Sequence, residues 1–178
     1  MTHEKAHVNM QAMLQALTHT REMILKEIEG LTDTQLNVKP KREKWSIVQN
    51  LHHLDLIEQA ATSAIKVALQ KGERKNTPMK SIDMTKDRTR KRQAPQQFMP
   101  TETIMKREQI QSLIELSRNK LLQIVNSAQT EDLLELSSEH PVYGELNLYQ
   151  WLEFLDLHEQ RHLEQIQEAK RALLRLNK

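Results

Sequence analysis

The residues best suited to chemistry lie in the stretch LHEQRHLEQI, residues 157–166. Its two histidines, His158 and His162, are four positions apart, and Glu159 directly follows the first, which spells the H-E-x-x-H motif of zinc proteases. On a helix, imidazoles at positions i and i+4 lie one turn apart and can reach one ion at about 2.0–2.1 Å, the zinc–nitrogen distance. The spacing therefore predicts a metal site with His158 and His162 as ligands.

A zinc protease with this motif takes its third ligand from a later element of the chain. Only residues 163–178 follow His162, and they continue the same helical pattern without a glycine that could turn the chain back. The sequence also lacks cysteine, so the remaining ligand must be an imidazole or a carboxylate from upstream. This geometry excludes the protease interpretation but leaves a metal site with an upstream ligand.

The upstream stretch NLHHL contains two adjacent histidines, His52 and His53. At about 100° per residue, His53 lies nearer the apolar face of its helix, beside small alanines, and His52 lies closer to the outer face. We therefore predict His53 as the third metal ligand and His52 as an exposed or supporting residue. Three histidines with an open fourth position form the arrangement that is typical of catalytic zinc.

The carboxylate of Glu159 has three interpretations. It can act as a general base, orient an imidazole, or pair with Arg21 or Arg161. Arg21 lies on the apolar stripe of its own segment, where a charged side chain must either reach solvent or find a partner inside. We interpret the remaining histidines as ordinary polar residues: His3, His7, His19 and His140.

The elements that must position these residues are helical. Apolar residues recur at three- and four-residue steps in four segments: residues 10–28, 47–71, 102–128, and from 147 almost to the end. Ser46 and Gln49 form a capping box before the second segment, and Gly72 follows its end. The chain has only 3 glycines and 5 prolines, which also favours long helices over a sheet.

The connection between the second and third segments, residues 72–100, has no periodic pattern. So long a loop is usually functional or mobile, and it allows the third helix to run parallel to the second. We therefore predict an all-α protein of one domain, residues 1–178: a four-helix bundle, up-down-down-up, with a long basic crossover between helices 2 and 3.

The charge of this crossover has two interpretations. Residues 71–92 contain nine Lys or Arg against three Asp or Glu, which could contact phosphates. A solvated, mobile loop is favoured, because no aromatic residues interleave to stack on bases. The net charge of +2 gives no general reason to expect a nucleic-acid partner. Without a signal peptide or a long apolar run, we expect a cytoplasmic protein that does not contact a membrane.

Two stretches resemble the DinB/YfiT-like superfamily of bacterial four-helix bundles: KWSIVQNLHHL at residues 44–54 and HPVYGELNLYQWLEFLDLHEQRHLEQI at residues 140–166. The lead-in LTDTQLNVKP at residues 31–40 fits the same pattern. The shared features are a Trp-Ser pair at a helix start, a histidine eight residues after the tryptophan, and a late H-x-x-x-H followed by Gln and Ile. The resemblance spans most of the chain.

The resemblance implies both a site and a chemistry. The metal triad of the superfamily falls on His53, His158 and His162. Its members bind a divalent ion, often zinc or nickel, and are frequently homodimers. Some are S-transferases that use a low-molecular-weight thiol, bacillithiol or mycothiol, as co-substrate.

Three hypotheses follow from these observations. The first is a metal-dependent enzyme, either a thiol-dependent S-transferase or a hydrolase, acting on a small-molecule substrate. The alternative is a non-enzymatic metal- or ligand-binding stress-response bundle, which a fourth ligand such as Asp55 or Glu159 would favour. The third is a nucleic-acid-associated protein that uses its basic crossover.

Overall fold

The computed structural model describes residues 9–89 and 93–176. Four long helices form a bundle: α1 (Met10–Ile28), α3 (Ile47–Lys71), α4 (Arg107–Ser127) and α6 (Leu148–Leu176). The connections carry the shorter elements, which are α2 (Asp33–Asn37), the single turns η1 (Asp83–Thr85) and η2 (Gln96–Phe98), α5 (Thr130–Glu135), and the strands β1 (Ser137–His140) and β2 (Gly144–Asn147).

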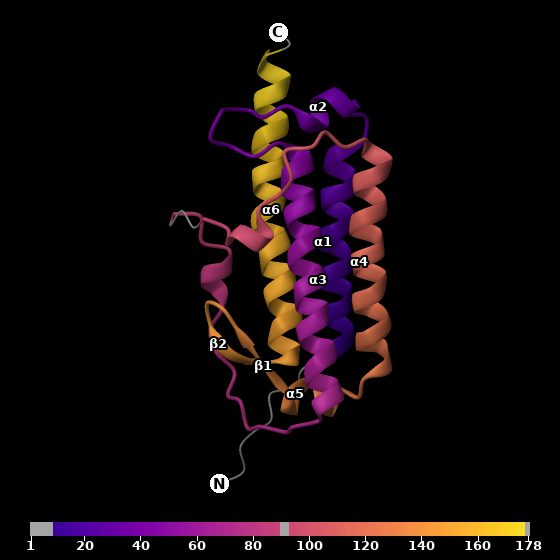
Figure 1. Cartoon of the computed structure of the whole chain (residues 1–178), viewed down its shortest axis with the longest axis vertical. Coiled ribbons are helices and arrows are strands. Elements are labelled where there is room, and N and C mark those ends of the chain that lie inside the picture. The colour runs from indigo at the N-terminus through magenta and orange to yellow at the C-terminus, as the bar shows by residue number, and fades with distance from the viewer. Residues whose placement is uncertain (1–8, 90–92, 177–178) are drawn as a thin grey trace.

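The bundle has the predicted up-down-down-up topology (Figure 1). Helices α1 and α6 run in one direction, and α3 and α4 run in the other. Helix α3 packs against both α4 and α6, and α1 packs against α6. The crossover leaves the end of α3, follows one side of α6, and passes in front of the α3–α6 pair to reach the start of α4 (Figure 1).

Local signals set the limits of α3 as the sequence predicts. The Ser46 hydroxyl accepts a hydrogen bond from the Gln49 amide at 3.1 Å, and the Gln49 side chain accepts one from the Ser46 amide, also at 3.1 Å. At the other end, Gly72 adopts a left-handed conformation with φ of 63°, which costs glycine no steric strain. The capping box and the glycine therefore fix the helix that carries His53.

Helix α4 begins at Arg107, five residues later than its apolar pattern predicts. The Asn37 side chain bonds both backbone groups of Met105, accepting from its amide at 3.1 Å and donating to its carbonyl at 2.8 Å. The Arg107 amide also donates to the Asp33 carboxylate at 2.9 Å. Contacts with α2 therefore hold the preceding residues outside the helix.

The sequence pattern missed three short elements. Helix α2 lies between the first two of the four predicted helical segments, where no helix was predicted, although Thr32 and Gln35 form a second capping box there. Helix α5 and the antiparallel β1–β2 hairpin precede α6, with His140 paired to Gly144. These elements are too short to show a period and are stabilised by packing against the bundle, α2 at one end and α5 with the hairpin at the other (Figure 1).

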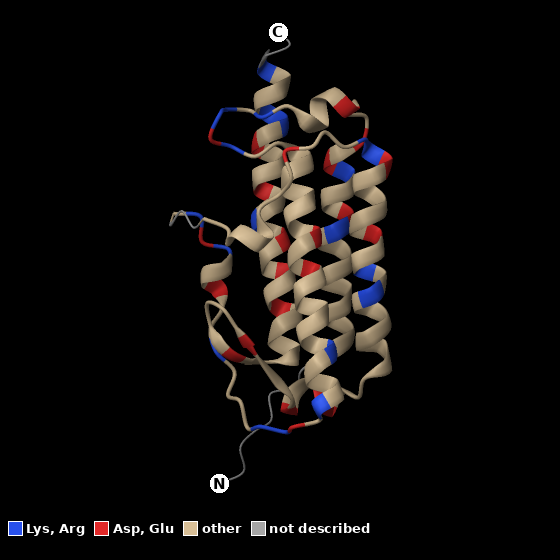
Figure 2. Cartoon of the chain, in the orientation of Figure 1, with Lys and Arg blue, Asp and Glu red and all other residues tan. Residues whose placement is uncertain are grey.

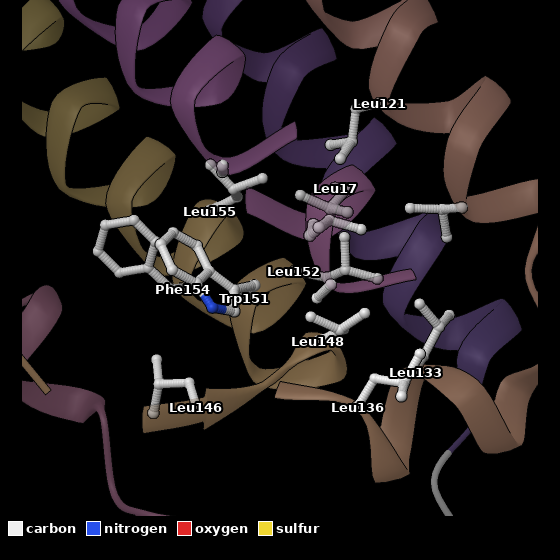
Figure 3. Packing of buried hydrophobic residues seen from close by; sticks show 14 of the residues in the cluster. Leu17, Leu121, Leu133, Leu136, Leu146, Leu148, Trp151, Leu152, Phe154 and Leu155 are labelled. Carbon is white, nitrogen blue, oxygen red and sulfur yellow. The ribbon is translucent and has the colours of Figure 1, made fainter. Parts of the chain in front are cut away.

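The core consists of two apolar clusters, one toward each end of the bundle. The cluster near the hairpin consists largely of leucines and aromatic residues, with the largest share from α6 (Figure 3), and α3 adds Ala61, Ile65 and Ala68. The other cluster includes Ile24, Leu51, Ile114 and Ile166, one from each long helix. Between the two clusters, every long helix contributes buried polar residues, and the candidate site lies on this layer.

Ion pairs fasten the basic crossover to the bundle. Arg74 pairs with Asp132 and Glu135 on α5, and Arg88 pairs with Glu164 and Glu168 on α6. Lysines and arginines are mixed with acidic residues throughout the view in Figure 2. Residues 90–92, which belong to the basic stretch, lie outside the described residues. The described helices include none with the length and apolar character that a membrane span requires.

Candidate metal centre

Packing of α3 against α6 brings together the three histidines that the sequence singled out. One ligand atom from each of His53, His158 and His162 lies within 4.8 Å of the other two. The ring centroids are 5.2 Å apart for His53 and His158, 4.9 Å for His53 and His162, and 4.6 Å for His158 and His162. His53 and His162 are buried and His158 is partly buried. Small rotations of the rings can therefore place all three nitrogens about 2.0–2.1 Å from one ion.

Two of the rings are oriented by oxygen acceptors. Nδ1 of His53 lies 2.7 Å from the Phe98 carbonyl, and Nδ1 of His162 lies 2.9 Å from Oδ1 of Asn50. The side-chain Nδ2 of Asn50 donates to the Ser46 carbonyl at 2.9 Å, which turns the side-chain Oδ1 toward His162. Because both partners accept, Nδ1 carries the hydrogen in each ring and Nε2 keeps its lone pair. Metal-binding histidines in proteins are held in this way.

The third ring lacks such an acceptor. Nδ1 of His158 is buried and has no hydrogen-bond partner among the described residues. An unmade hydrogen bond of this kind costs about 1–3 kcal/mol. A cluster of three imidazoles with one unsatisfied ring nitrogen fits a metal ion better than it fits a purely structural core.

Burial keeps these imidazoles neutral. Desolvation lowers the pKa of His53, and it lowers those of His158 and His162 far more strongly. The neighbouring histidines add to the effect, since a charge on one ring opposes a charge on the next. Neutral imidazole is the form that binds a metal, so the site is in its binding form at neutral pH.

Aromatic rings surround the cluster. The Trp45 ring lies 4.9 Å from His53 and stacks at 6.1 Å on His162, while Phe154 stacks on His158 at 5.4 Å. Trp45 immediately precedes the cap of α3, and Phe154 lies one turn before His158 on α6. These rings limit the access of water to the ligands.

Carboxylates are absent from the ligand group that the described residues form. Asp55 is buried and accepts a hydrogen bond from Gln59 at 2.8 Å. The Glu159 carboxylate is directed into an ion-pair network in the bundle interior. The three histidines therefore leave room for a further ligand, as in catalytic rather than structural zinc sites.

Glu159 pairs with Arg21, one of the partners that the sequence suggested. Its Oε1 accepts hydrogen bonds from Nε of Arg21 at 3.0 Å and from the Arg118 guanidinium at 2.7 Å. Arg161, the other suggested partner, donates instead to the backbone carbonyl of Asp87 in the crossover.

The same network contains two residues that the sequence analysis missed, Glu58 and Arg118. Glu58 accepts from Nε of Arg118 at 2.6 Å and from Arg21 at 3.2 Å. Burial opposes ionisation of Glu58, but the two arginines outweigh it and lower its pKa. A signal was present: each long helix places one member of this network on its apolar stripe, two arginines and two glutamates in all.

The remaining histidines differ from one another. His52 is partly buried, and its Nδ1 accepts a hydrogen bond from the Thr101 amide at 3.0 Å, so it supports the crossover. His19 is exposed on α1, as expected of an ordinary polar residue. His3 and His7 lie outside the described residues.

His140 is not the ordinary polar residue that we expected. It is 5% exposed and packs against Phe154, with ring centroids 4.4 Å apart. Its Nδ1 accepts hydrogen bonds from the amides of Val142 and Tyr143 at 3.1 and 3.3 Å. Burial lowers the pKa of His140 to about 4.

Replacing His140 with asparagine should reduce the acid sensitivity of the fold. The substitution removes the titrating ring and keeps an acceptor for the two amides. The unfolded chain binds a proton near the ordinary pKa of 6.5 and the folded protein only near 4, so stability falls as the pH drops through this window. From pH 7 to pH 5, metal-free wild type should lose about 2 kcal/mol more unfolding free energy than His140→Asn, measured in urea. Equal losses would contradict the buried, neutral state of His140.

Comparison with known proteins agrees with this fold. The chain is 34% identical to the uncharacterized protein YuaE of Bacillus subtilis over 149 aligned residues. These residues make up 84% of this chain and 91% of YuaE. The four-helix bundle protein TT2238 has a TM-score of 0.64 at 18% identity, covering 89% of this chain and 98% of that one. YfiT from Bacillus subtilis has a TM-score of 0.62 at 16% identity, covering 97% and 92% of the two chains.

YfiT is described as a probable metal-dependent hydrolase with an unusual four-helix bundle topology. At its low identity, the likeness to YfiT shows a shared fold. The sequence match is more specific, because residues 16–166 fit the model of the DinB superfamily and include all three clustered histidines. With its up-down-down-up bundle and its histidines on α3 and α6, this chain belongs to the DinB superfamily.

Proposed function

We propose that this protein is a divalent-metal-dependent enzyme in which His53, His158 and His162 hold the ion. The observation that carries the proposal is the convergence of three neutral imidazoles, without a carboxylate of the described residues among them. All-imidazole ligation suits Zn²⁺ and Ni²⁺. When bound, such an ion acts as a Lewis acid that makes a bound water or thiol far more acidic.

The other residues of the site position these ligands. Asn50 and the Phe98 carbonyl hold two imidazoles with Nε2 free, and Trp45 and Phe154 shield the cluster from bulk water. We assign Glu159 mainly to the ion-pair network, because Arg21 and Arg118 both donate to its Oε1. Its Oε2 has no hydrogen-bond partner among the described residues, so Glu159→Gln tests whether this carboxylate also acts as a general base. The nucleophile would come from solvent or from a small molecule, since the chain has no cysteine.

Two reactions fit this site. Attack of water on an ester or amide is supported by the description of YfiT as a metal-dependent hydrolase. Attack of a small thiol on an electrophile, which is S-transfer, is supported by the resemblance to superfamily members with that activity. Both need the same open position beside the three histidines, so the ligand geometry suits either one.

Protein purified without a histidine tag tests this proposal. Elemental analysis should find about one divalent ion per chain. The loaded protein should then either hydrolyse a chromogenic ester or amide, or accelerate the reaction of a small bacterial thiol with an aryl halide. That activity should disappear on chelation and in His162→Ala.

The outcomes separate the hypotheses. A chain that binds no divalent ion would overturn the metal site. A loaded protein without metal-dependent activity toward either class of substrate would favour the non-enzymatic metal-binding alternative.

A further inference from the structure

Part of the crossover lies directly against the metal centre. Three residues of α3 bond the backbone of residues 98–101. His53 donates to the Phe98 carbonyl at 2.7 Å, and His52 accepts from the Thr101 amide at 3.0 Å. Gln49 donates to the Thr101 carbonyl at 3.4 Å. Figure 1 shows this part of the chain passing in front of α6 and α3.

The preceding part of the crossover is fastened to α6 instead. The Gln150 side chain accepts from the Lys80 amide at 3.1 Å and donates to its carbonyl at 2.6 Å. Arg88 reaches Glu164 at 3.1 Å and Glu168 at 2.8 Å. The crossover therefore bridges the two helices that supply the ligands, and it touches the ligand His53 itself.

The two oriented ligands differ in what orients them. His162 is held by Asn50, a residue inside α3 that cannot move without the helix. His53 is held by a backbone carbonyl outside any long helix, and that carbonyl stays in place only while residues 98–101 are docked. Of these two rings, His53 therefore depends on the conformation of the crossover.

We propose that residues 98–101 form the positioning element of His53, and that their docking on α3 is coupled to metal binding. This proposal rests on the proposed metal site. A cation bound by the His53 ring would withdraw electron density from it, so Nδ1–H would become a stronger donor to the Phe98 carbonyl. Because the coupling is reciprocal, a docked segment strengthens metal binding by the same factor by which metal strengthens docking. His52 and Gln49 act on the metal through this segment, as positioning residues.

Zinc titration of the His52→Ala variant tests the coupling. The substitution removes the acceptor for the Thr101 amide and leaves the three ligands unchanged. At pH 7.5, Zn²⁺ should still bind one ion per chain but about tenfold more weakly, at the lower end of the range for residues that support metal ligands. His52→Asn, whose amide oxygen can replace the ring nitrogen as acceptor, should restore most of the affinity. His19→Ala, on the exposed face of α1, is the matched control and should bind like wild type.

Hydrogen exchange supplies the second measurement. Saturating Zn²⁺ should slow exchange of the Thr101 amide in wild type about tenfold, which is the same coupling seen from the other site. This zinc-dependent slowing should be lost in His52→Ala. Slow exchange of the α3 amides in the same sample shows that this variant is folded.

The two proposals fail differently. Unchanged zinc affinity in His52→Ala, or unchanged Thr101 exchange in zinc-loaded wild type, overturns the coupling and leaves the metal site intact. Wild type that does not bind Zn²⁺ overturns both.

Discussion

Replacing His158 with leucine should abolish stoichiometric metal binding without weakening the metal-free fold. The substitution removes one of three ligands, so Zn²⁺ affinity should fall by more than the roughly 10–100-fold typical of losing a supporting residue. The same substitution removes a buried ring nitrogen that lacks a hydrogen-bond partner among the described residues. Because that nitrogen costs about 1–3 kcal/mol, the unfolding free energy of the metal-free protein should stay constant or rise.

Zinc titration and urea unfolding in chelator measure these two effects. His162→Leu is the informative companion, because it removes a ligand together with the hydrogen bond to Asn50. That variant should lose both metal and stability. His19→Leu, at an exposed position, should change neither quantity appreciably. Retention of metal by His158→Leu would remove His158 from the site.

Replacing Glu58 with leucine should destabilise the bundle by about 3–5 kcal/mol. Glu58 accepts from Arg118 at 2.6 Å, from Ser117 at 2.6 Å and from Arg21 at 3.2 Å, and all of these groups are buried. Its loss leaves two buried arginines with Glu159 as their one remaining carboxylate in the network. The cost comes from uncompensated buried charge rather than from lost apolar contact.

Urea unfolding measures the loss of unfolding free energy in Glu58→Leu. Glu115→Leu, at an exposed position on α4, is the matched control. A second variant tests the cause. Replacing all four charged residues of the network with apolar ones of similar size leaves none of its charges uncompensated, so it should recover most of the loss. A cost below about 1 kcal/mol for Glu58→Leu alone would show that the network contributes little.

The candidate metal ligands illustrate how far local rules reach. His158 and His162 share a face because four residues make about one helical turn, a fact that needs no tertiary information. His53 could be preferred over His52 because the apolar stripe of its helix marks the buried side. The start of α3 at Ser46 and its end at Gly72 follow equally local hydrogen-bonding rules. These features were therefore open to prediction.

The supporting residues of the site were not. The acceptor for His162 is Asn50, 112 residues away, and the acceptor for His53 is a carbonyl of the crossover, which no side-chain pattern marks. Glu159, the partner of Arg21, lies 138 residues away in the sequence. The late start of α4 likewise depends on Asn37, which lies in α2, a helix too short to show a helical repeat in the sequence.

Helix periodicity and caps act over a few residues, so the chain alone specified its long helices and which histidines face inward. The pairing of those helices set the rest: which acceptor holds each ring, how buried charges balance, and where the crossover meets the ligands. Such contacts form only when segments far apart in the chain pack together, because only then do desolvation and neighbouring groups act on each side chain.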